Sequence, residues 1–320
     1  MDLKGKIMKK KKLTVIEKTG VTFKEGCEMY LDYCRERNLR EHTIKHYQNS
    51  FNRLFKFFDM DMQLNDFTLE SYNSYLKHLQ ETLNNDITIS GYLRDLMTLI
   101  YYLQNQSYVE EFKMKSIKAD RHAIETYNDS ELDKLLKKPN TKCCTFLEYE
   151  SWVICNLLFS TGLRQSSFIN IRVRDVDLNN RLINIMHTKN RKPLLIPLNS
   201  TMANILKEFI KIRKPDDEDD YLFCNSFGEQ LAKNTSYMML REYNIRRGVT
   251  KVGIHRWRHT MAKNWVLNNG NVVTLCRLLG HSSLDITQNY LNLLVSDLSK
   301  AVDEVDILSK YGEKKSIKMR

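Results

Sequence analysis

The chain has 320 residues, 42% of them hydrophobic, which is enough for roughly two domains that each bury a core. The formal net charge of +11 favours a polyanionic partner, nucleic acid before membrane, and no stretch is long and apolar enough to span a bilayer. The seven cysteines are odd in number and scattered, so they predict neither a disulfide framework nor a zinc site. The charge by itself does not establish a polyanionic partner, since a protein that is merely rich in lysine would have the same net charge.

Residues 1–20 form a basic extension without the apolar core of a signal peptide, so we expect a cytoplasmic protein. Residues 21–114 are predicted to be helical throughout, as a small four-helix unit whose last two helices span residues 66–83 and 88–103. The polar faces of these helices either contact phosphates or are simply solvated. Their basic residues are Arg37, Arg40, Lys45, Arg53, Lys56 and Arg94.

The helical periodicity lapses over residues 115–127, which we predict to be a linker. The second domain, predicted over residues 128–294, opens with a helix capped by Asp129 or Ser130. A later helix, through Trp152 and Phe159, is apolar on nearly every side and should be buried; Thr161-Gly162 ends it. Arg164 therefore emerges at a helix junction, a common place to present a side chain to a ligand.

From Arg181 the hydrophobic period changes to two, which predicts a β-hairpin built from LINIM and PLLIP. Its turn, HTKNRK, carries Lys189, Arg191 and Lys192. The acidic run at residues 216–220 is expected to be a solvated loop, because its spacing lacks the glycine and terminal glutamate of an EF-hand calcium site.

The segment of residues 254–290 concentrates side chains suited to attack on a phosphodiester without a metal. His255, Arg258 and His259 occupy positions i, i+3 and i+4, so they share one face of a predicted helix. The two histidines could instead be core residues or zinc ligands, but they lack the intervening glutamate of a zinc protease.

Two further residues of this segment follow glycine and capping signals. Gly280 is expected to cap a helix in the left-handed conformation, which leaves His281 on the loop after it. Ser282 and Asp285 resemble a capping box that starts another helix, on which Tyr290 lies. An unselected tyrosine usually packs with its hydroxyl at the surface, so the spacing from His281 is what distinguishes Tyr290.

Taken together, these motifs resemble the tyrosine recombinases of the phage-integrase and Xer type. The matching positions, in the family's order, are TGLR ending at Arg164, Lys189 in the hairpin, HRWRH with His255 and Arg258, LGH with His281, and Tyr290. The resemblance implies a mainly α fold with a small β-hairpin or sheet. It implies a helical, SAM-like core-binding domain at the N-terminus and a mixed α+β catalytic domain after it.

The resemblance implies an enzyme, a site-specific recombinase or integrase of a bacterium, phage or mobile element. Such an enzyme cleaves and rejoins DNA through a 3′-phosphotyrosine, with Tyr290 as nucleophile and without ATP, metal or other cofactor. In-line attack on a phosphate places extra charge on its non-bridging oxygens, and two guanidinium groups bind such oxygens well. Arg164 and Arg258 are the residues that match this role.

The proton transfers fall to other matching positions. His255 is the expected base, because an imidazole titrates in the range needed to help a tyrosine lose its proton. Lys189 is the expected acid for the departing 5′ oxygen, with Lys192 and Arg191 as competitors for that role. His281 is expected to hydrogen-bond the transferring phosphate.

One position departs from the family pattern: Ser167 stands where the family usually carries an acid. This puts the orientation of Arg164 in question, and Asp175 is not assumed to replace the acid. His259 is expected to be structural or to lie near the phosphate, and Trp257 to pack in the core. Two other functions stay open, a catalytically weak DNA-binding relative and a relaxer similar to type IB topoisomerases.

The resemblance also implies partners: double-stranded DNA with paired inverted core sites, and a homotetramer in the synaptic complex that is a monomer or weak dimer when free. An accessory directionality protein is a further candidate, and no membrane is involved. Residues 295–320 form a tail with an apolar helical pattern and a basic end. This tail either docks into a neighbouring protomer, as in the family, or folds back on its own domain.

Overall fold

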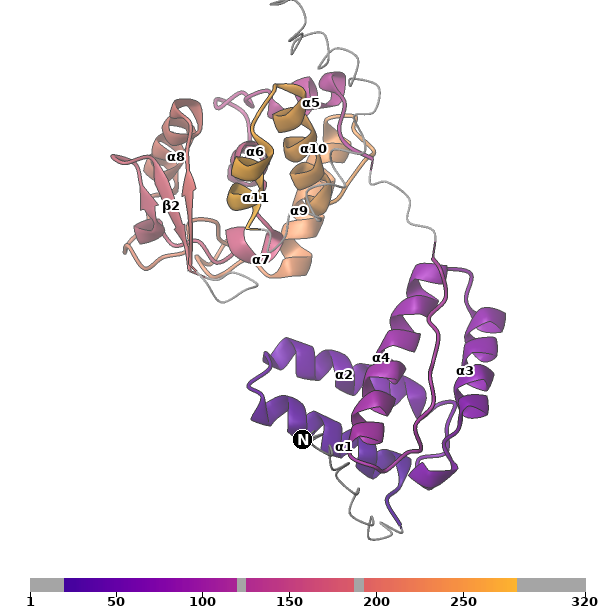
Figure 1. The fold of residues 1–320 in the computed structure, drawn as a ribbon. Coiled ribbons are helices and arrows are strands. Elements are labelled where there is room, and N and C mark those ends of the chain that lie inside the picture. The colour runs from indigo at the N-terminus through magenta and orange to yellow at the C-terminus, as the bar shows by residue number, and fades with distance from the viewer. Residues whose placement is uncertain (1–19, 120–124, 187–192, 281–320) are drawn as a thin grey trace, which may run out of the picture. The chain divides into compact units, whose positions relative to one another are not determined.

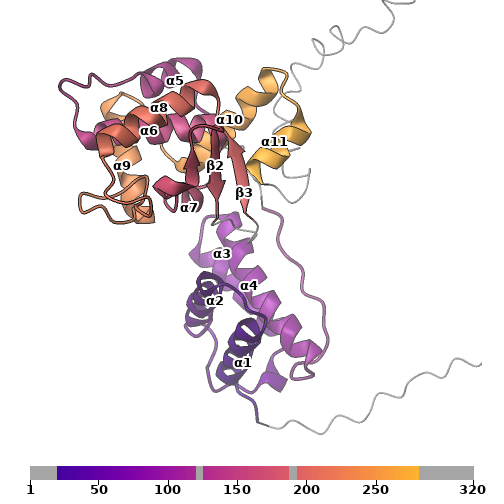
Figure 2. The ribbon, with the colours of Figure 1, turned by 90° about the vertical axis from the view of Figure 1, so that its left-hand side faces the viewer.

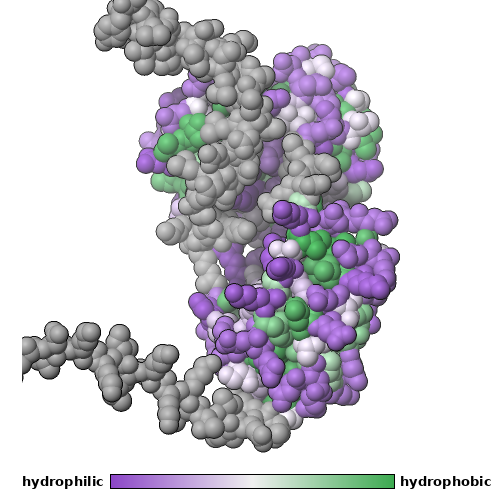
Figure 3. Space-filling model, turned by 45° about the vertical axis from the view of Figure 1, so that its right-hand side comes forward, coloured by the Kyte–Doolittle hydropathy of each residue, from purple (hydrophilic) through white to green (hydrophobic). Residues whose placement is uncertain are grey.

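The computed structural model describes residues 20–119, 125–186 and 193–280. They form helices and one small antiparallel sheet, which confirms the predicted mainly α fold (Figure 1). The chain divides into two compact units, Met1–Ala123 and Ile124–Arg320. The faces of the two units visible in Figure 3 are mainly hydrophilic, with smaller apolar patches. Within the described ranges, no helix has the length and apolar character needed to cross a membrane.

Residues 20–119 of the first unit form four α-helices and a short 3-10 helix. They are α1 (Phe23–Glu36), α2 (Glu41–Leu54), η1 (Leu64–Asp66), α3 (Leu69–Thr82) and α4 (Asp86–Asn105). A capping box starts α1: the Thr22 hydroxyl accepts from the Glu25 N–H at 3.2 Å, and the Glu25 carboxylate accepts from the Thr22 N–H at 2.8 Å. Phe23, the first residue of α1, is fully buried in an aromatic cluster with Phe58 and Phe67.

The end of this unit differs from the prediction of helices throughout residues 21–114. The last helix, α4, ends at Asn105, and residues 110–119 continue without helix. Met114 is nevertheless buried, and the Tyr72 hydroxyl of α3 donates to the Lys115 carbonyl at 2.9 Å. These contacts hold the departing chain against the helices, which periodicity along the sequence does not reveal.

The second unit contains seven α-helices within the described ranges. They are α5 (Asp129–Leu136), α6 (Phe146–Thr161), α7 (Gln165–Phe168), α8 (Ser200–Arg213), α9 (Lys233–Arg246), α10 (Ile254–Leu267) and α11 (Val272–Leu279). The cap of α5 is Asn128, not the predicted Asp129 or Ser130. Its side chain accepts from the Glu131 N–H, and the Glu131 carboxylate accepts from the Asn128 N–H, both at 2.9 Å. This reciprocal pair fixes the helix start one residue earlier.

The sheet has the strand order β1-β2-β3, with β1 (Val176–Asp177), β2 (Leu182–Ile185) and β3 (Leu194–Pro197). The antiparallel pairing of β2 with β3 confirms the predicted hairpin. Alternate side chains of the hairpin face the core, and Ile183 lies opposite Ile196. The sequence did not reveal β1, since two residues are too few for a period-two pattern.

The core of the second unit is built around α6, which contacts α5, α8, α9 and α10 (Figures 1 and 2). Because neighbours surround it, its apolar residues are buried on nearly all sides, as predicted. The helix ends where Gly162 adopts the left-handed conformation, with φ of 63°. Trp257 of α10 is buried in the same core, also as expected.

The acidic run, residues 216–220, is mostly exposed, as predicted, but it is also ion-paired. Asp219 pairs with Arg172 and Arg174, and Asp220 lies 3.4 Å from Nη1 of Arg213. In the part of the chain that the structure describes, no group of three or more His, Cys, Asp or Glu side chains is placed to hold a metal ion.

Candidate active site

Helix α10 holds the residues of the predicted HRWRH motif at different depths in the protein. Ile254 and Trp257 point into the core and fix the helix, while the intervening His255 is exposed. Arg258 is buried, one turn after Ile254, and His259 is half-buried. The helix thus offers an exposed imidazole next to a buried guanidinium.

Two backbone carbonyls hold the guanidinium of Arg258. Its Nη1 donates to the Gly162 carbonyl at 2.8 Å, and its Nη2 donates to the Leu279 carbonyl at 2.7 Å. A buried charge needs such hydrogen bonds to offset its lost hydration. Arg258 therefore joins the end of α6 to the end of α11.

Arg164 reaches the same place from the junction of α6 and α7. Its side chain is half-buried, and its Nη1 donates to the Leu279 carbonyl at 3.3 Å. Leu279 is the last residue of α11, where carbonyls have no partner within the helix and carry partial negative charge. The structure therefore brings both predicted arginines to one backbone oxygen.

Two glycines allow this close approach. Gly162 has φ of 63°, and a Cβ there would lie only 2.6 Å from Cδ2 of Leu279. Gly280 has φ of 60°, as its predicted left-handed cap requires, and a Cβ there would lie 3.3 Å from Cδ2 of Leu194. Since Leu194 begins β3, this strand of the hairpin starts beside the Gly280 cap.

His255 lies close enough to Arg164 and Arg258 for their positive charges to act on its imidazole. The protein around the imidazole removes part of its hydration, and the charges of Arg258 and Arg164 add repulsion; together they lower the pKa of His255 below its ordinary value. Partial burial also lowers the pKa of His259, with smaller contributions from His255, Arg258 and Arg256. Both histidines therefore favour the neutral form, which is the form that can accept a proton.

The structure also describes Ser167, which stands in place of the family's usual acid, and Asp175, which is not assumed to replace that acid. Ser167 is buried in α7, and its N–H donates to the Arg164 carbonyl at 2.9 Å. The Asp175 carboxylate accepts from the Arg172 N–H at 2.8 Å, so it caps its own 3-10 turn, η2 (Val173–Asp175). Asp175 thus has a local structural role of its own.

Three of the six predicted site residues, Lys189, His281 and Tyr290, lie outside the described residues. The other three, Arg164, His255 and Arg258, lie together.

Sequence analysis missed the Leu279 carbonyl, because a backbone acceptor has no side-chain signature. The signal that could have indicated it is the glycine directly after it, since a left-handed cap marks a helix end with unpaired carbonyls.

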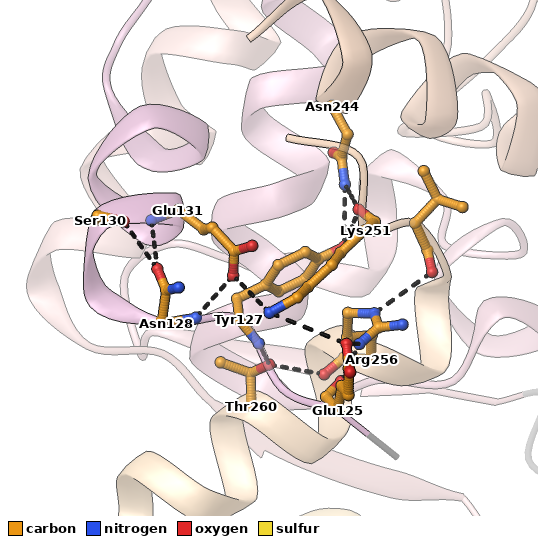
Figure 4. Close-up of polar contacts among 10 residues, drawn as sticks. Glu125, Tyr127, Asn128, Ser130, Glu131, Asn244, Lys251, Arg256 and Thr260 are labelled. Atoms are coloured by element: carbon orange, nitrogen blue, oxygen red, sulfur yellow. Dashed lines mark hydrogen bonds and ion pairs between the residues drawn. The ribbon is translucent and has the colours of Figure 1, made fainter. Parts of the chain in front are cut away.

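The start of the second unit is also tied to α10 (Figure 4). The Tyr127 N–H donates to the Thr260 hydroxyl at 3.0 Å, and the Tyr127 ring packs on Trp257 with centroids 4.6 Å apart. The Asn244 side chain donates to the Tyr127 hydroxyl at 2.9 Å. Arg256 pairs with Glu125 in the same cluster. These contacts fasten α10 to residues 125–127, the end of the predicted linker.

Similarity to proteins of known structure shows the same fold. The Tn1549 transposon integrase, solved in complex with circular intermediate DNA, matches with a TM-score of 0.68 and 18% identity, covering 83% of this chain and 94% of that one. A lambda integrase dimer bound to a COC′ core site matches with a TM-score of 0.66 and 15% identity, covering 84% and 95%.

Curated relatives are recombinases by name. A tyrosine recombinase of Pseudothermotoga lettingae is 27% identical over 276 residues, which are 84% of this chain and 93% of that protein. The tyrosine recombinase XerD of Listeria monocytogenes is 24% identical over 267 residues, 80% and 89% of the two chains. The phage integrase SAM-like domain matches residues 27–121, and the model of the phage integrase family matches residues 126–296. The chain therefore belongs to the phage integrase family.

Proposed function

We propose that this site-specific DNA recombinase breaks and rejoins DNA through a covalent 3′-phosphotyrosine at Tyr290. The observation that carries the proposal is the meeting of Arg164 and Arg258 at the Leu279 carbonyl, beside His255. Neither a DNA-binding relative without catalysis nor a topoisomerase-like relaxer is favoured, since the family and its named relatives are recombinases.

In the first step, the Tyr290 hydroxyl oxygen attacks the scissile phosphorus, and the bond from phosphorus to the 5′ oxygen breaks. His255 takes the tyrosine proton; its lowered pKa keeps it neutral and ready at neutral pH. Arg164 and Arg258 bind the non-bridging oxygens, whose charge grows in the transition state.

Lys189 gives a proton to the departing 5′ oxygen, and His281 hydrogen-bonds the phosphate. In the second step, a 5′ hydroxyl of another strand attacks the phosphotyrosine and releases Tyr290. The bond energy is kept in the covalent intermediate, so no ATP is needed.

The proposal extends to domains and partners. Residues 21–114 act as a core-binding domain and residues 128–294 as the catalytic domain, joined by residues 115–127, and both bind double-stranded DNA with paired inverted core sites. A structural neighbour, lambda integrase, was solved as a tetramer on a Holliday junction, which supports a homotetramer here during synapsis. Cytoplasmic action and an accessory directionality protein belong to the same proposal. The tail, residues 295–320, docks in trans or in cis.

Covalent trapping tests the nucleophile. Nicked duplexes from the DNA flanking the gene are incubated with the natural protein, with Tyr290→Phe and with a matched control, Tyr237→Phe, which changes an exposed tyrosine of α9. We expect an adduct that survives denaturant with the natural protein and the control, and none with Tyr290→Phe.

An adduct that persists in Tyr290→Phe would assign the nucleophile to another residue. Tight binding of the duplex without any adduct would support a DNA-binding protein instead.

A further inference from the structure

We propose that Gly162 and Leu279 are positioning residues of the recombination reaction, which together set the spacing of the Arg164 and Arg258 guanidinium groups. The inference rests on the proposed function, because it concerns the same pair of arginines. Neither residue offers a side chain that could carry out acid, base or nucleophilic chemistry.

The first step of the argument is the shared acceptor. Nη2 of Arg258 lies 2.7 Å and Nη1 of Arg164 lies 3.3 Å from the Leu279 carbonyl oxygen, so the two nitrogens cannot be farther apart than the sum of these distances. Two guanidinium groups repel each other, and the partial negative charge at the end of α11 offsets that repulsion. The carbonyl therefore keeps two like charges close together, as joint binding of one phosphate requires.

The second step concerns what fixes this carbonyl. The Leu279 side chain is 1% exposed and packs in a small apolar cluster with Met261, Ala262 and Leu275. Met261 lies three residues after Arg258 on α10, so the cluster fastens α11 to the helix that presents Arg258. The position of the Leu279 carbonyl thus depends on how its own side chain packs.

The third step is the missing side chain at Gly162. A Cβ there would lie 2.6 Å from Cδ2 of Leu279, 3.4 Å from Sδ of Met261 and 3.7 Å from Cγ of Arg258. Leu279 is fully buried and has little room to move away. A side chain at residue 162 would therefore push the end of α11, with its carbonyl, away from the two arginines.

The test compares two substrates for each variant. Nicked duplexes from the DNA flanking the gene carry either the natural phosphate or a neutral methylphosphonate at the scissile position, and the rate of covalent adduct formation is measured. Arginines act on charged oxygens, so misplacing them should slow the reaction of the phosphate far more than that of the methylphosphonate. A general loss of folded protein lowers both rates equally.

We expect Gly162→Ala and Leu279→Ala to lower the rate on the phosphate by about 100-fold, as a small misplacement of catalytic groups does, and the rate on the methylphosphonate by much less. The matched control is Leu206→Ala, which removes an equally buried leucine from the main core of the second unit, outside this cluster. It should lower both rates by the same factor. Equal losses on both substrates in Gly162→Ala and Leu279→Ala would overturn the inference.

A second measurement needs no DNA and so separates this inference from the proposed function. Because the charges of Arg258 and Arg164 help to lower the pKa of His255, NMR titration of its imidazole reports on their positions. The midpoint should rise in Gly162→Ala and stay unchanged in Leu206→Ala. An unchanged midpoint in Gly162→Ala would refute the positioning role even if adducts form normally, whereas a shifted midpoint in a protein that forms no adduct would refute only the recombinase mechanism.

Discussion

The hydroxyl of Thr260 accepts a hydrogen bond from the backbone N–H of Tyr127 at 3.0 Å and donates one to the Arg256 carbonyl at 2.8 Å. Thr260 is fully buried on α10, between the turns that carry His255 and Arg258 and the end of the helix. One hydroxyl therefore connects the entry of the chain into the second unit with the helix of the active site (Figure 4).

Replacing Thr260 with valine should destabilise the second unit by about 1 to 3 kcal/mol, because the Tyr127 N–H would lose its acceptor in a buried place. Urea unfolding followed by tryptophan fluorescence measures this, since all three tryptophans, Trp152, Trp257 and Trp265, lie in that unit. As a control in the same unit, Ser151→Ala removes a similar bond, which the Ser151 hydroxyl donates to the Leu147 carbonyl at 2.7 Å, and leaves no described N–H without its acceptor. An unchanged unfolding midpoint in Thr260→Val would show that the Tyr127 N–H finds another acceptor.

Arg258→Lys should lower the rate of covalent adduct formation by roughly 100-fold or more. A lysine keeps the charge but cannot donate in fixed directions to the Gly162 and Leu279 carbonyls at once, as Arg258 does. The rate on a nicked duplex, measured in a single turnover, checks this. Arg256→Lys is the matched control on the same helix, and a similar loss in both variants would argue against a special role for Arg258.

The pH dependence of adduct formation should report on His255. Partial loss of hydration and the charges of Arg258 and Arg164 lower the pKa of His255 from 6.5, so the neutral, proton-accepting form persists below that pH. The rate should therefore be level near pH 7 and fall only at pH values below about 6.5. Rates of adduct formation measured between pH 5 and 8 check this. A rate that already decreases above pH 7, as the pH is lowered, would show that His255 is not the base.

Glu150 should make the stability of the second unit depend on pH. Burial raises its pKa to about 7, although the Cys224 N–H and the charge of Arg213 act in the opposite direction. The folded state thus holds a proton that the unfolded state releases above pH 4.5, so the free energy of unfolding falls as the pH rises from about 4.5 to 7.

Glu150→Gln should remove this slope and stabilise the protein by about 1 to 3 kcal/mol above pH 7, with little effect at pH 4.5. Urea unfolding at a series of pH values measures it. Glu242→Gln, which changes an exposed residue of α9, should leave the pH dependence as it is. The same slope in Glu150→Gln as in the natural protein would assign the pH dependence to other groups.

Local patterns in the sequence predicted the features that local physics determines. The i, i+3 spacing of His255 and Arg258, the helix end at Gly162, the left-handed cap at Gly280 and the period-two hairpin all appear in the structure. Each depends on backbone geometry within a few residues, so a single sequence contains the information.

Contacts between distant segments could not be predicted in the same way. The Leu279 carbonyl that joins Arg164 to Arg258 is a backbone atom, and the bond between Tyr127 and Thr260 spans more than a hundred residues. Neither leaves a periodic signal.

The apolar cluster under α11 is separate from the main core of the second unit, which is organised around α6. A helix held by so few buried side chains can open while the core stays folded, as a cooperative unit of its own. Amide protons of α11 should therefore exchange with solvent at a lower free energy than those of α6. Because the Leu279 carbonyl belongs to α11, such an opening separates Arg164 from Arg258 while the core around α6 stays folded.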